Sequence, residues 1–458
     1  MTKEPVRILV VGGGYVGMYT ALRLQQTLRR KLQRGEVEIV VVAPDPYMTY
    51  QPFLPEAAAG SISPRHVVVP LRRTLPACRI IVGEATSVDH TARVATVETV
   101  TSAEEGAPLT VPYDELVLAP GSVVRTLPVP GLAEHGIGFK TVEEAIALRN
   151  HVLEQLDIAS STRNVEVRDS ALTFVFVGGG YAGVEALGEL EDMARYACRY
   201  YHNLRPEDLR FLLVEASDRV LPEVGAEMGR YTLRELRRRN IDVRLETRLD
   251  SCRGRVAVLS DGSRHPARTL VWTAGVKPHP VLAATGLPRN GRGRLRCTPQ
   301  LRVVDTEHAW SAGDCAAVPD LTAEAREPDP EATTPTCAPN AQHAVRQARR
   351  LAENLTAALD GAELSDYRHP YSGSVASLGL HKGVAHVYGR KLKGYPAWLL
   401  HRAYHLSRVP TFNRKAKVLA EWTLSGLFKR EIVSLGSLEH PRAEFEVAAG
   451  TDRRTGGS

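Results

Sequence analysis

Two glycine-rich segments, each lying between an apolar run and a helical stretch, constrain this chain most. The first joins the apolar residues 8–11 to a helical pattern over residues 18–31 through Gly12-Gly13-Gly14-Tyr15-Val16-Gly17, and a second apolar run follows at residues 37–42. This order predicts a βαβ unit. In such a loop Gly12 permits a tight turn, Gly14 lets a pyrophosphate approach the backbone, and Gly17 lets the helix pack against the strand. The helix N-terminus then binds the phosphates through its free N–H groups.

The second segment repeats the first. The apolar residues 174–177 lead into Gly178-Gly179-Gly180-Tyr181-Ala182-Gly183, a long helical pattern follows, and the apolar residues 211–214 end at Glu215. Two such units in one chain predict two bound dinucleotides. A carboxylate at the position of Glu215 accepts both ribose hydroxyls of NADH and repels the 2′-phosphate of NADPH, so NADH is favoured. Arg219 lies close enough in the sequence to soften that preference.

Composition limits the class of protein. A chain of 458 residues with 43% hydrophobic content is expected to form several globular domains. The N-terminus lacks the pattern of a secretory signal, which predicts a cytoplasmic protein, and no apolar segment reaches the roughly twenty residues of a spanning helix. The histidines lack metal-ligand spacing, so no metal site is expected. The six cysteines are scattered without a Cys-x-x-Cys pair, so a dithiol mechanism is not expected either.

Basic residues gather between residues 381 and 430, where Glu421 is the single acidic residue. Such a block indicates an anionic surface nearby. Interleaved aromatic residues, among them Trp398 and Trp422, favour a lipid interface over nucleic acid, so no nucleic-acid partner is expected. A merely solvated basic face remains an open alternative.

The order of these pieces resembles the pyridine-nucleotide-dependent flavoprotein reductases, and within them the type II (non-proton-pumping) NADH:quinone oxidoreductases. The resemblance covers residues 6–435. It implies an α/β fold of two Rossmann-like dinucleotide-binding domains, one for FAD and one for NADH, the second inserted in the first, with a small C-terminal amphipathic helical region. It places the FAD domain at residues 1–140 and 286–375, the NADH domain at 141–285, a membrane-associating region at 376–440 and a disordered tail at 441–458.

The resemblance also assigns residues to the two cofactors. The residues that it implies for FAD are Gly12, Gly14, Gly17, Gln51, Ala119, Gly121 and Asp314, the last as a ribityl contact. Those implied for NADH are Gly178, Gly180, Gly183, Glu215 and Gly275. Glu185 corresponds to a glutamate near the nicotinamide–flavin junction. Lys382 is a candidate for stabilising the reduced flavin at its pyrimidine end, although an isolated lysine in a basic region is ordinarily surface charge.

The stretch Ala341-Gln342-His343-Ala344-Val345-Arg346-Gln347 resembles the Ala-Gln-x-Ala-x-Gln quinone-site motif of that family. In that setting Gln342 faces the flavin and hydrogen-bonds a quinone carbonyl. Arg346 stands where the motif has its second glutamine, and Gln347 points elsewhere because a helix turns about 100° per residue. The arginine either stabilises a quinol anion or marks a different acceptor.

A second departure lies at the end of the first unit's second strand. Ala43 stands where the family has an acid for the FAD ribose, and Asp45 follows two residues later, so Asp45 is the candidate substitute. Near the C-terminus, residues 396–409 and 414–428 read as two amphipathic helices. Cationic amphipathic helices lie in the membrane interface, which predicts peripheral association with the inner face of the cell membrane. A homodimer interface, or an ordinary packed core, is an alternative use of the same faces.

The predicted activity is hydride transfer from NADH to FAD followed by two-electron transfer to a membrane quinone, without proton pumping. Two alternatives stay open. One is a soluble NAD(P)H-dependent flavoprotein reductase that donates to a ferredoxin-like or other redox partner. The other is a non-catalytic, nucleotide-sensing binding protein. Sulfide:quinone oxidoreductase shares the architecture but needs cysteines beside the flavin, and none follows Gly121 before the second glycine loop.

Overall fold

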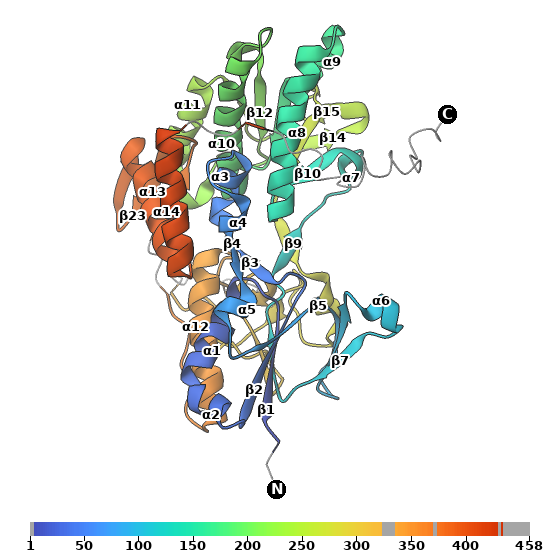
Figure 1. Cartoon of the computed structure of the whole chain (residues 1–458), viewed down its shortest axis with the longest axis vertical. Helices are drawn as coiled ribbons and strands as arrows, with labels where there is room; N and C mark the ends of the chain where they lie inside the picture. Colours follow the sequence, from blue (N-terminus) through green and yellow to red (C-terminus); the bar gives the residue numbers. More distant parts are fainter. Residues whose placement is uncertain (1–3, 323–334, 370–372, 429–431, 434–458) are drawn as a thin grey trace, which may run out of the picture. The chain divides into compact units, whose positions relative to one another are not determined.

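The computed structural model describes residues 4–322, 335–369, 373–428, 432 and 433 (Figure 1). The chain forms two compact units, each built from three separate stretches of sequence. Unit 1 comprises residues 1–50, 68–125 and 275–372, and unit 2 comprises residues 51–67, 126–274 and 373–458. The predicted tail at 441–458 lies outside the described residues. No helix in the described part of the chain is long and apolar enough to cross a membrane.

Unit 1 is built on a seven-stranded sheet with the strand order β20-β8-β1-β2-β5-β6-β7. The strands from β20 to β5 pair in parallel, whereas β6 and β7 continue the sheet antiparallel from the second half of β5. The strands span β1 (Val6–Val11), β2 (Val37–Ala43), β5 (Arg79–Asp89), β6 (Val94–Thr99), β7 (Leu109–Pro112), β8 (Glu115–Leu118) and β20 (Ala309–Ser311). The central strands β1 and β8 are almost entirely buried, as expected of a parallel sheet covered on both faces.

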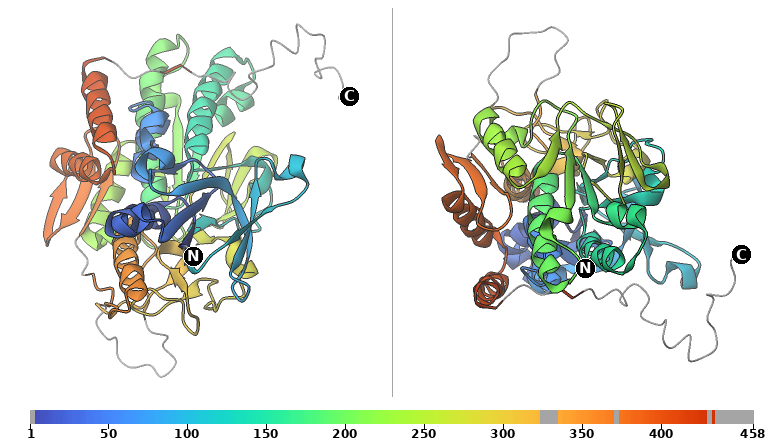
Figure 2. Two further views of the ribbon diagram at one scale, coloured as in Figure 1. Left: turned by 60° about the horizontal axis from the view of Figure 1, so that its bottom comes forward. Right: turned by 90° about the horizontal axis from the view of Figure 1, so that it is seen from above.

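Two long helices of unit 1, α1 (Tyr15–Thr27) and α12 (Ala341–Leu359), lie side by side (Figures 1 and 2). The Thr20 hydroxyl donates to the Ala348 carbonyl at 3.3 Å. The smaller elements are α2 (Arg29–Gln33), β3 (Tyr47–Thr49), β4 (Val68–Pro70), α5 (Leu71–Thr74), α6 (Ser102–Glu105), β9 (Ser122–Val124), β18 (Val276–Pro278), η6 (Pro280–Ala284), β19 (Leu295–Arg296), η7 (Gly313–Cys315) and β21 (Ala316–Ala317). In unit 1, β1 leads into Gly12, and α1 and then β2 follow it, which is the βαβ order that the sequence predicts.

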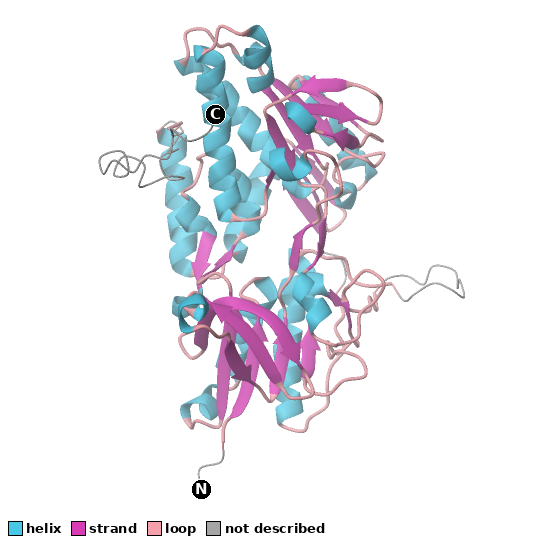
Figure 3. Ribbon diagram, turned by 90° about the vertical axis from the view of Figure 1, so that its right-hand side faces the viewer, coloured by secondary structure: helices cyan, strands magenta, loops and turns pink. Residues whose placement is uncertain are grey.

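Unit 2 contains a five-stranded sheet, all parallel, with the order β10-β17-β11-β12-β13 (Figure 3). Its strands are β10 (Gly136–Gly138), β11 (Thr173–Val177), β12 (Arg210–Val214), β13 (Ile241–Arg244) and β17 (Thr269–Trp272). The helices of this part are α7 (Leu132–His135), α8 (Val142–Ser161), α9 (Val165–Ala171), α10 (Tyr181–Ala197) and α11 (Ala226–Arg238), with the 3₁₀ turns η2 (Cys198–Tyr200), η3 (Pro206–Asp208), η4 (Pro222–Val224) and η5 (Arg253–Arg255). A small antiparallel sheet joins β14 (Leu249–Ser251), β15 (Val256–Leu259) and β16 (Arg264–Pro266).

The C-terminal part of unit 2 begins with an antiparallel sheet that the sequence did not suggest. Its strands are β22 (Gly373–Ser377), β23 (Gly383–Val387) and β24 (Arg390–Lys393). The two predicted helices follow as α13 (Tyr395–Arg408) and α14 (Phe412–Leu427). The short elements η1 (Gln51–Phe53), α3 (Leu54–Ala58) and α4 (Pro64–Val67) belong to the same unit. A Cβ on Gly188 of α10 would lie 2.6 Å from the Leu378 backbone, so this small residue permits the turn that follows β22 to pack closely on α10.

Candidate functional site

The two glycine loops have nearly the same backbone geometry. Gly12 has φ +114° and Gly178 has φ +115°, a region that favours glycine. A Cβ on Gly12 would lie 2.1 Å from the Ala119 carbonyl oxygen. A Cβ on Gly17 would lie 1.8 Å from the Gly12 carbonyl oxygen, and one on Gly183 would lie 1.9 Å from the Gly178 oxygen. The first and third glycines of both loops are therefore required by the fold itself.

The middle glycines are different. Gly14 is the N-cap residue of α1 and Gly180 that of α10, and neither helix start has a side-chain cap. A Cβ on either glycine would meet nothing within 4 Å, so no neighbouring protein atom requires glycine there. A diphosphate lying against the backbone N–H groups of the helix start does require it. Both loops thus fit a bound dinucleotide.

Ala43 and Glu215 occupy the same position in the two units. The Gly12 N–H donates to the Val42 carbonyl at 2.8 Å, and the Gly178 N–H donates to the Val214 carbonyl at 2.8 Å. The next residue along each strand is therefore Ala43 in unit 1 and Glu215 in unit 2. A carboxylate is present at this position only in unit 2.

The Glu215 carboxylate lies directly beneath the second glycine loop. One oxygen accepts the Gly179 N–H at 2.5 Å, and the other accepts the Ser217 N–H and hydroxyl, both at 2.7 Å. These donors orient the carboxylate, and a carboxylate has lone pairs left for ribose hydroxyls. Arg219 makes a two-pronged ion pair with Asp218, at 2.9 and 2.7 Å, so its charge is already neutralised by a neighbour. The geometry fits NADH better than NADPH.

Asp314 lies in η7, which follows the C-terminal end of β20. The Ser122 hydroxyl donates to its carboxylate at 2.7 Å. The Gly313 N–H donates to the Gln347 side-chain oxygen at 2.8 Å, and Gln347 is 1% exposed. Ser122 therefore orients the Asp314 carboxylate, and Gln347 holds the backbone of the residue before it. Neither residue was predicted from the sequence to have that role. Ser122 directly follows the predicted flavin residue Gly121, and this position in the sequence could have indicated its role.

Helix α12 presents the residues of the predicted quinone site on different faces. Asn340 caps the helix by accepting the His343 N–H at 2.9 Å, and Ala341 is exposed. Arg346 donates to the Gln342 side-chain oxygen at 3.3 Å, and both residues are half-buried. Gln347 instead faces η7, where its side-chain oxygen accepts the Gly313 N–H. Gln342 and Arg346 thus share a face that Gln347 does not, as the helical spacing predicts.

Glu185 lies in the second turn of α10 and is 7% exposed. Its Oε1 accepts the Ser377 N–H at 2.9 Å and lies 3.1 Å from Nε2 of His401 on α13. His401 is 2% exposed, which makes this a buried carboxylate–imidazole contact. His401 was not predictable from the sequence, because nothing local links two residues so far apart in the chain.

The remaining predicted residues lie at chain turns. Lys382 lies in the hairpin between β22 and β23, and Gln51 begins η1 and donates to the Lys140 carbonyl at 3.4 Å, both within unit 2. Asp45 follows β2 and is exposed in unit 1. Gly275 follows β17 with φ +90° and open space around its Cβ position. Their roles toward the cofactors stay predictions.

Comparison with known proteins places this architecture in a family. The pyridine nucleotide-disulphide oxidoreductase model matches residues 4–348, about three quarters of the chain, so the chain belongs to that family. A type II NADH:quinone oxidoreductase of Staphylococcus epidermidis is 28% identical over 405 residues, 87% of this chain and 94% of the relative. The type II NADH:quinone oxidoreductase Ndh of Mycobacterium tuberculosis is 26% identical over 440 residues, 93% of this chain and 89% of the relative.

Solved structures show the same fold. NDH2 from Plasmodium falciparum in complex with NADH superposes with a TM-score of 0.84 at 16% identity, covering 94% of this chain and all of that one. The sulfide:quinone oxidoreductase of Aquifex aeolicus gives 0.67 at 17% identity, covering 93% and 96%. These findings confirm the predicted family resemblance, the α/β fold class, and the assignment to FAD- and pyridine-nucleotide-dependent oxidoreductases.

Proposed function

We propose that this chain oxidises NADH through bound FAD and passes the two electrons to a quinone without pumping protons. The observation that carries the proposal is the pair of matched glycine loops, each with an open middle glycine, in a chain whose like-sized relatives are type II NADH:quinone oxidoreductases. The net reaction converts NADH, a proton and a quinone into NAD⁺ and a quinol.

The cysteines argue against the other chemistries of this fold. All six are free, and burial raises the pKa of each thiol above its ordinary value. A redox-active dithiol or a sulfide-oxidising pair needs a thiolate, which a depressed pKa supplies. Electrons therefore leave the flavin for an external acceptor and not through a protein disulfide.

Each unit has a defined part in this mechanism. The Gly12 loop, Asp314 and Ser122 would hold FAD in unit 1, and the Gly180 loop and Glu215 would hold NADH in unit 2. When bound, FAD supplies the hydride-accepting and electron-donating chemistry, while the protein supplies binding and orientation. Gln342 would donate to the carbonyl of the acceptor.

An anaerobic spectroscopic titration tests the proposal. The purified holoenzyme is mixed with NADH, which should bleach the flavin absorbance, and a menaquinone analogue is then added, which should restore it within the same fast time range. Bleaching without recovery would rule out the quinone and favour a protein acceptor such as a ferredoxin-like partner. A chain that binds nucleotide but is not bleached would be a nucleotide-sensing protein.

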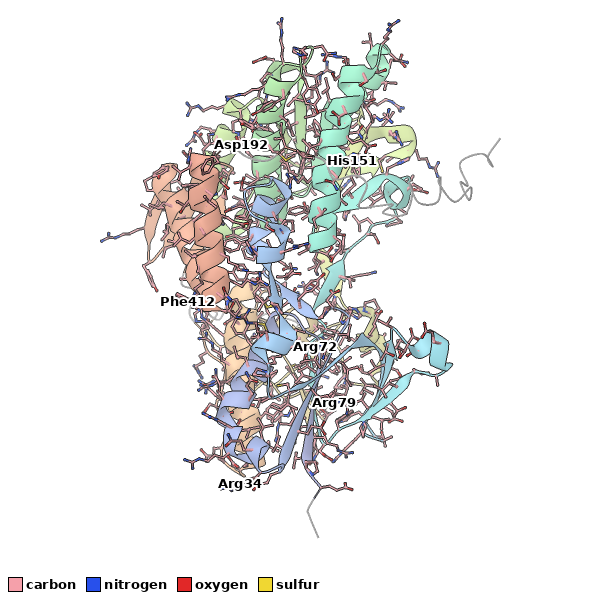
Figure 4. All side chains as sticks on the ribbon, in the orientation of Figure 1. Arg34, Arg72, Arg79, His151, Asp192 and Phe412 are labelled. Carbon is pink, nitrogen blue, oxygen red and sulfur yellow. The ribbon has the colours of Figure 1, made fainter. Side chains whose placement is uncertain are left out.

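We further propose that α13 and α14 attach the protein to the inner face of the cell membrane. Phe412, Leu419 and Leu427 on α14 are 85%, 53% and 74% exposed, and their spacing of seven and eight residues places them on one helical face (Figure 4 labels Phe412). The opposite face packs within unit 2 through Val418 and Trp422. Neighbouring lysines, including Lys417, suit anionic lipid headgroups.

Vesicle flotation distinguishes this membrane surface from a dimer interface. The wild-type protein should float with vesicles that contain phosphatidylglycerol, and L419S/L427S should remain at the bottom of the gradient. The matched control V165S removes an equally exposed apolar side chain from α9, in a distant part of unit 2, and should float normally. If L419S/L427S still floats but changes from dimer to monomer in sedimentation, the surface is a homodimer interface.

A further inference from the structure

The second glycine loop is tied to a neighbouring segment through one of its own peptide groups. The Leu221 N–H donates to the Gly179 carbonyl oxygen at 2.9 Å, while the Gly179 N–H donates to Glu215. In a trans peptide the carbonyl and the next N–H point in opposite directions, and the described residues contain no cis peptide bond. Because Leu221 holds the Gly179 carbonyl, the Gly180 N–H must point away from Leu221.

The Gly180 N–H is a donor that a diphosphate could use. Gly180 is the N-cap of α10, and its N–H has no hydrogen-bond partner in the part of the chain that the structure describes. No protein atom lies within 4 Å of its Cβ position. Free N–H groups at a helix start bind phosphate oxygens. The bond from Leu221 therefore fixes the direction of a donor on the open side of the loop.

Leu221 makes this bond from an unfavourable backbone conformation. Its φ of +48° and ψ of +59° lie in the left-handed region, which bulky side chains rarely adopt. Pro222 follows, and the residue before a proline prefers extended backbone angles. Such a conformation persists only when the surrounding structure enforces it, and residues of this kind gather at functional sites.

Two features hold Leu221 in that conformation. Its side chain is 0% exposed, so a return to extended angles would have to move a buried leucine. On α11, a Cβ at Gly229 would lie 2.8 Å from the Val220 carbonyl oxygen, so α11 can approach Val220 only because residue 229 is glycine. Val220 and Leu221 are therefore clamped between α11 and the glycine loop.

The first glycine loop is held differently. Among the described residues no N–H donates to the Gly13 carbonyl, and side chains of Ala43 and Leu71 lie 2.7 and 2.9 Å from the Cβ position of Gly13 instead. In the proposed mechanism FAD stays bound, whereas NADH enters and leaves in every turnover. A loop that empties in each cycle benefits from a fixed donor, because less ordering is then needed when the ligand binds.

We infer that Leu221 is a positioning residue of the nucleotide site: its backbone N–H holds the Gly179 carbonyl and thereby directs the Gly180 N–H toward the diphosphate of NADH. This inference rests on the proposed function and adds to it a residue outside the glycine loop that acts through Gly179. Loss of the bond should weaken binding of the diphosphate and leave the hydride-transfer step unchanged.

Two measurements separate binding from chemistry. Calorimetry gives the Kd of the oxidised holoenzyme for ADP-ribose, which has the diphosphate and lacks the nicotinamide. The dependence of anaerobic flavin bleaching on NADH concentration gives the half-saturating concentration of NADH and the limiting rate of hydride transfer. Neither measurement needs a quinone.

Backbone conformation and side-chain packing make opposite predictions at position 221. L221A removes the buried side chain that enforces the angles, so the Kd and the half-saturating concentration should rise about fivefold to tenfold, the size of one hydrogen bond, at an unchanged limiting rate. Glycine adopts positive φ without steric cost, so L221G should bind more tightly than L221A although its side chain is smaller. A purely packing role would give the reverse order.

A variant of α11 tests the same bond from the other side. G229A places a methyl group against the Val220 carbonyl and should raise both constants while residue 221 stays leucine. G426A adds a methyl group at an open position of α14 and should change neither constant. L236A truncates an equally buried leucine of α11 and should lower the Tm without changing the Kd. FAD content shows that each variant is folded.

The outcomes separate this inference from the proposed function. If L221A binds ADP-ribose as tightly as L236A does, or if L221G binds more weakly than L221A, the inference is wrong and the proposed function stands. If NADH bleaches the flavin and no quinone restores it, the proposed acceptor is wrong, and the predicted order of affinities would still support the inference. A wild-type protein that binds no ADP-ribose and is not bleached by NADH would overturn both.

Discussion

One position carries a carboxylate in one glycine-loop unit and none in the other, and we propose that it sets how each unit binds a ribose. In unit 2 Glu215 places a carboxylate oxygen 2.5 Å from the Gly179 nitrogen, whereas in unit 1 the equivalent Ala43 has no polar side chain. The two βαβ units thus share the backbone geometry of the loop and differ in the side chain that we propose recognises the nucleotide ribose. A carboxylate there favours two ribose hydroxyls and opposes a 2′-phosphate.

We predict that E215Q shifts the nucleotide preference toward NADPH. The variant loses the negative charge that repels the 2′-phosphate and weakens the bonds to the ribose, so the ratio of kcat/KM for NADH over NADPH should fall by about tenfold. The rate of flavin bleaching with each nucleotide measures it. E166Q, a matched change at an exposed position of α9, should leave the ratio as it is. An unchanged ratio in E215Q would mean that the carboxylate does not read the ribose.

At the residue scale, the sequence predicts the residues that the backbone geometry requires. It does not predict the side chains that distant segments of the same chain contribute. Gly12 and Gly178 were identifiable because left-handed turns between strand and helix favour glycine. The supports of the site were not: Gln347 holds Gly313 and His401 contacts Glu185, each from another segment of the chain. A spacing pattern places a residue on a helix face, but it does not reveal the partner that this face meets.

At the scale of elements, α13 is held in unit 2 by two consecutive residues that reach different carboxylates. His401 contacts Glu185 of α10, and Arg402 donates to Glu56 of α3 at 3.2 Å. The Arg402 guanidinium also lies 4.1 Å from the Trp398 ring centroid and 4.8 Å from that of Trp422. The side chains of Arg402 and Glu56 are 11% and 4% exposed, so this ion pair is shielded from water.

Removing one partner of that pair should be costly. R402M leaves the Glu56 charge buried, with the Trp422 indole N–H as a remaining donor, so we expect a loss of roughly 3–5 kcal/mol in the free energy of unfolding. Urea unfolding measures it. R408M, a change of the same type at an exposed position of α13, should have little effect. The double variant E56Q/R402M should recover much of the loss, because no charge is then stranded. Equal losses in the single and double variants would assign the effect to packing.

The same helix should make unit 2 sensitive to acid. Burial, and then the charge of His401, lower the pKa of His405 well below its ordinary 6.5. The rings of His401 and Phe53 lie 4.5 and 6.3 Å away, and the nearby charged groups are Glu185, Glu56 and Arg402. Because the folded pKa is the lower one, the unfolded chain binds more protons below pH 6.5. Stability is therefore complete above pH 6.5 and is lost as the pH falls below it.

H405F should flatten this dependence, since phenylalanine keeps the edge contact with Phe53 and does not titrate. The measurement is the Tm of wild type and variant between pH 7.5 and 5. The slope should decrease without vanishing, because His369, with a pKa of about 4, contributes with the same sign from unit 1. Parallel Tm profiles for the two proteins would show that His405 is not the acid-sensitive group.

At the scale of the whole molecule, the two units alternate along the chain. Residues 51–67 belong to unit 2, although the stretches before and after them, 1–50 and 68–125, belong to unit 1. Unit 2 also contains the β22–β24 sheet and α13. The fold class was predictable because each βαβ unit is local in sequence. The assignment of residues 51–67 and 373–393 was not predictable, since it depends on long-range packing such as that of the Leu378 backbone against Gly188. The predicted domain boundaries, and which unit binds which cofactor, remain predictions.

Two matched glycine variants separate the half-reactions that the two units are proposed to perform. A methyl group at Gly14 or Gly180 meets no protein atom within 4 Å, so G14A and G180A should fold with nearly the wild-type Tm. In contrast, a Cβ at Gly17 would lie 1.8 Å from the Gly12 oxygen, so G17A should be strongly destabilised. Each open position is therefore a place where a substitution acts on the nucleotide and not on the fold.

G14A should be purified with little FAD, whereas G180A should keep its FAD and be bleached by NADH at least about tenfold more slowly than wild type. Reduced by dithionite, G180A should still be reoxidised by the quinone at the wild-type rate, because the electron acceptor does not use the second loop. A G180A protein that loses FAD, or a G14A protein that keeps it and loses only its reaction with NADH, would reverse the assignment of the two loops. Slow reoxidation of dithionite-reduced G180A would instead mean that the pyridine nucleotide takes part in the second half-reaction, and the two units would then not act as independent sites.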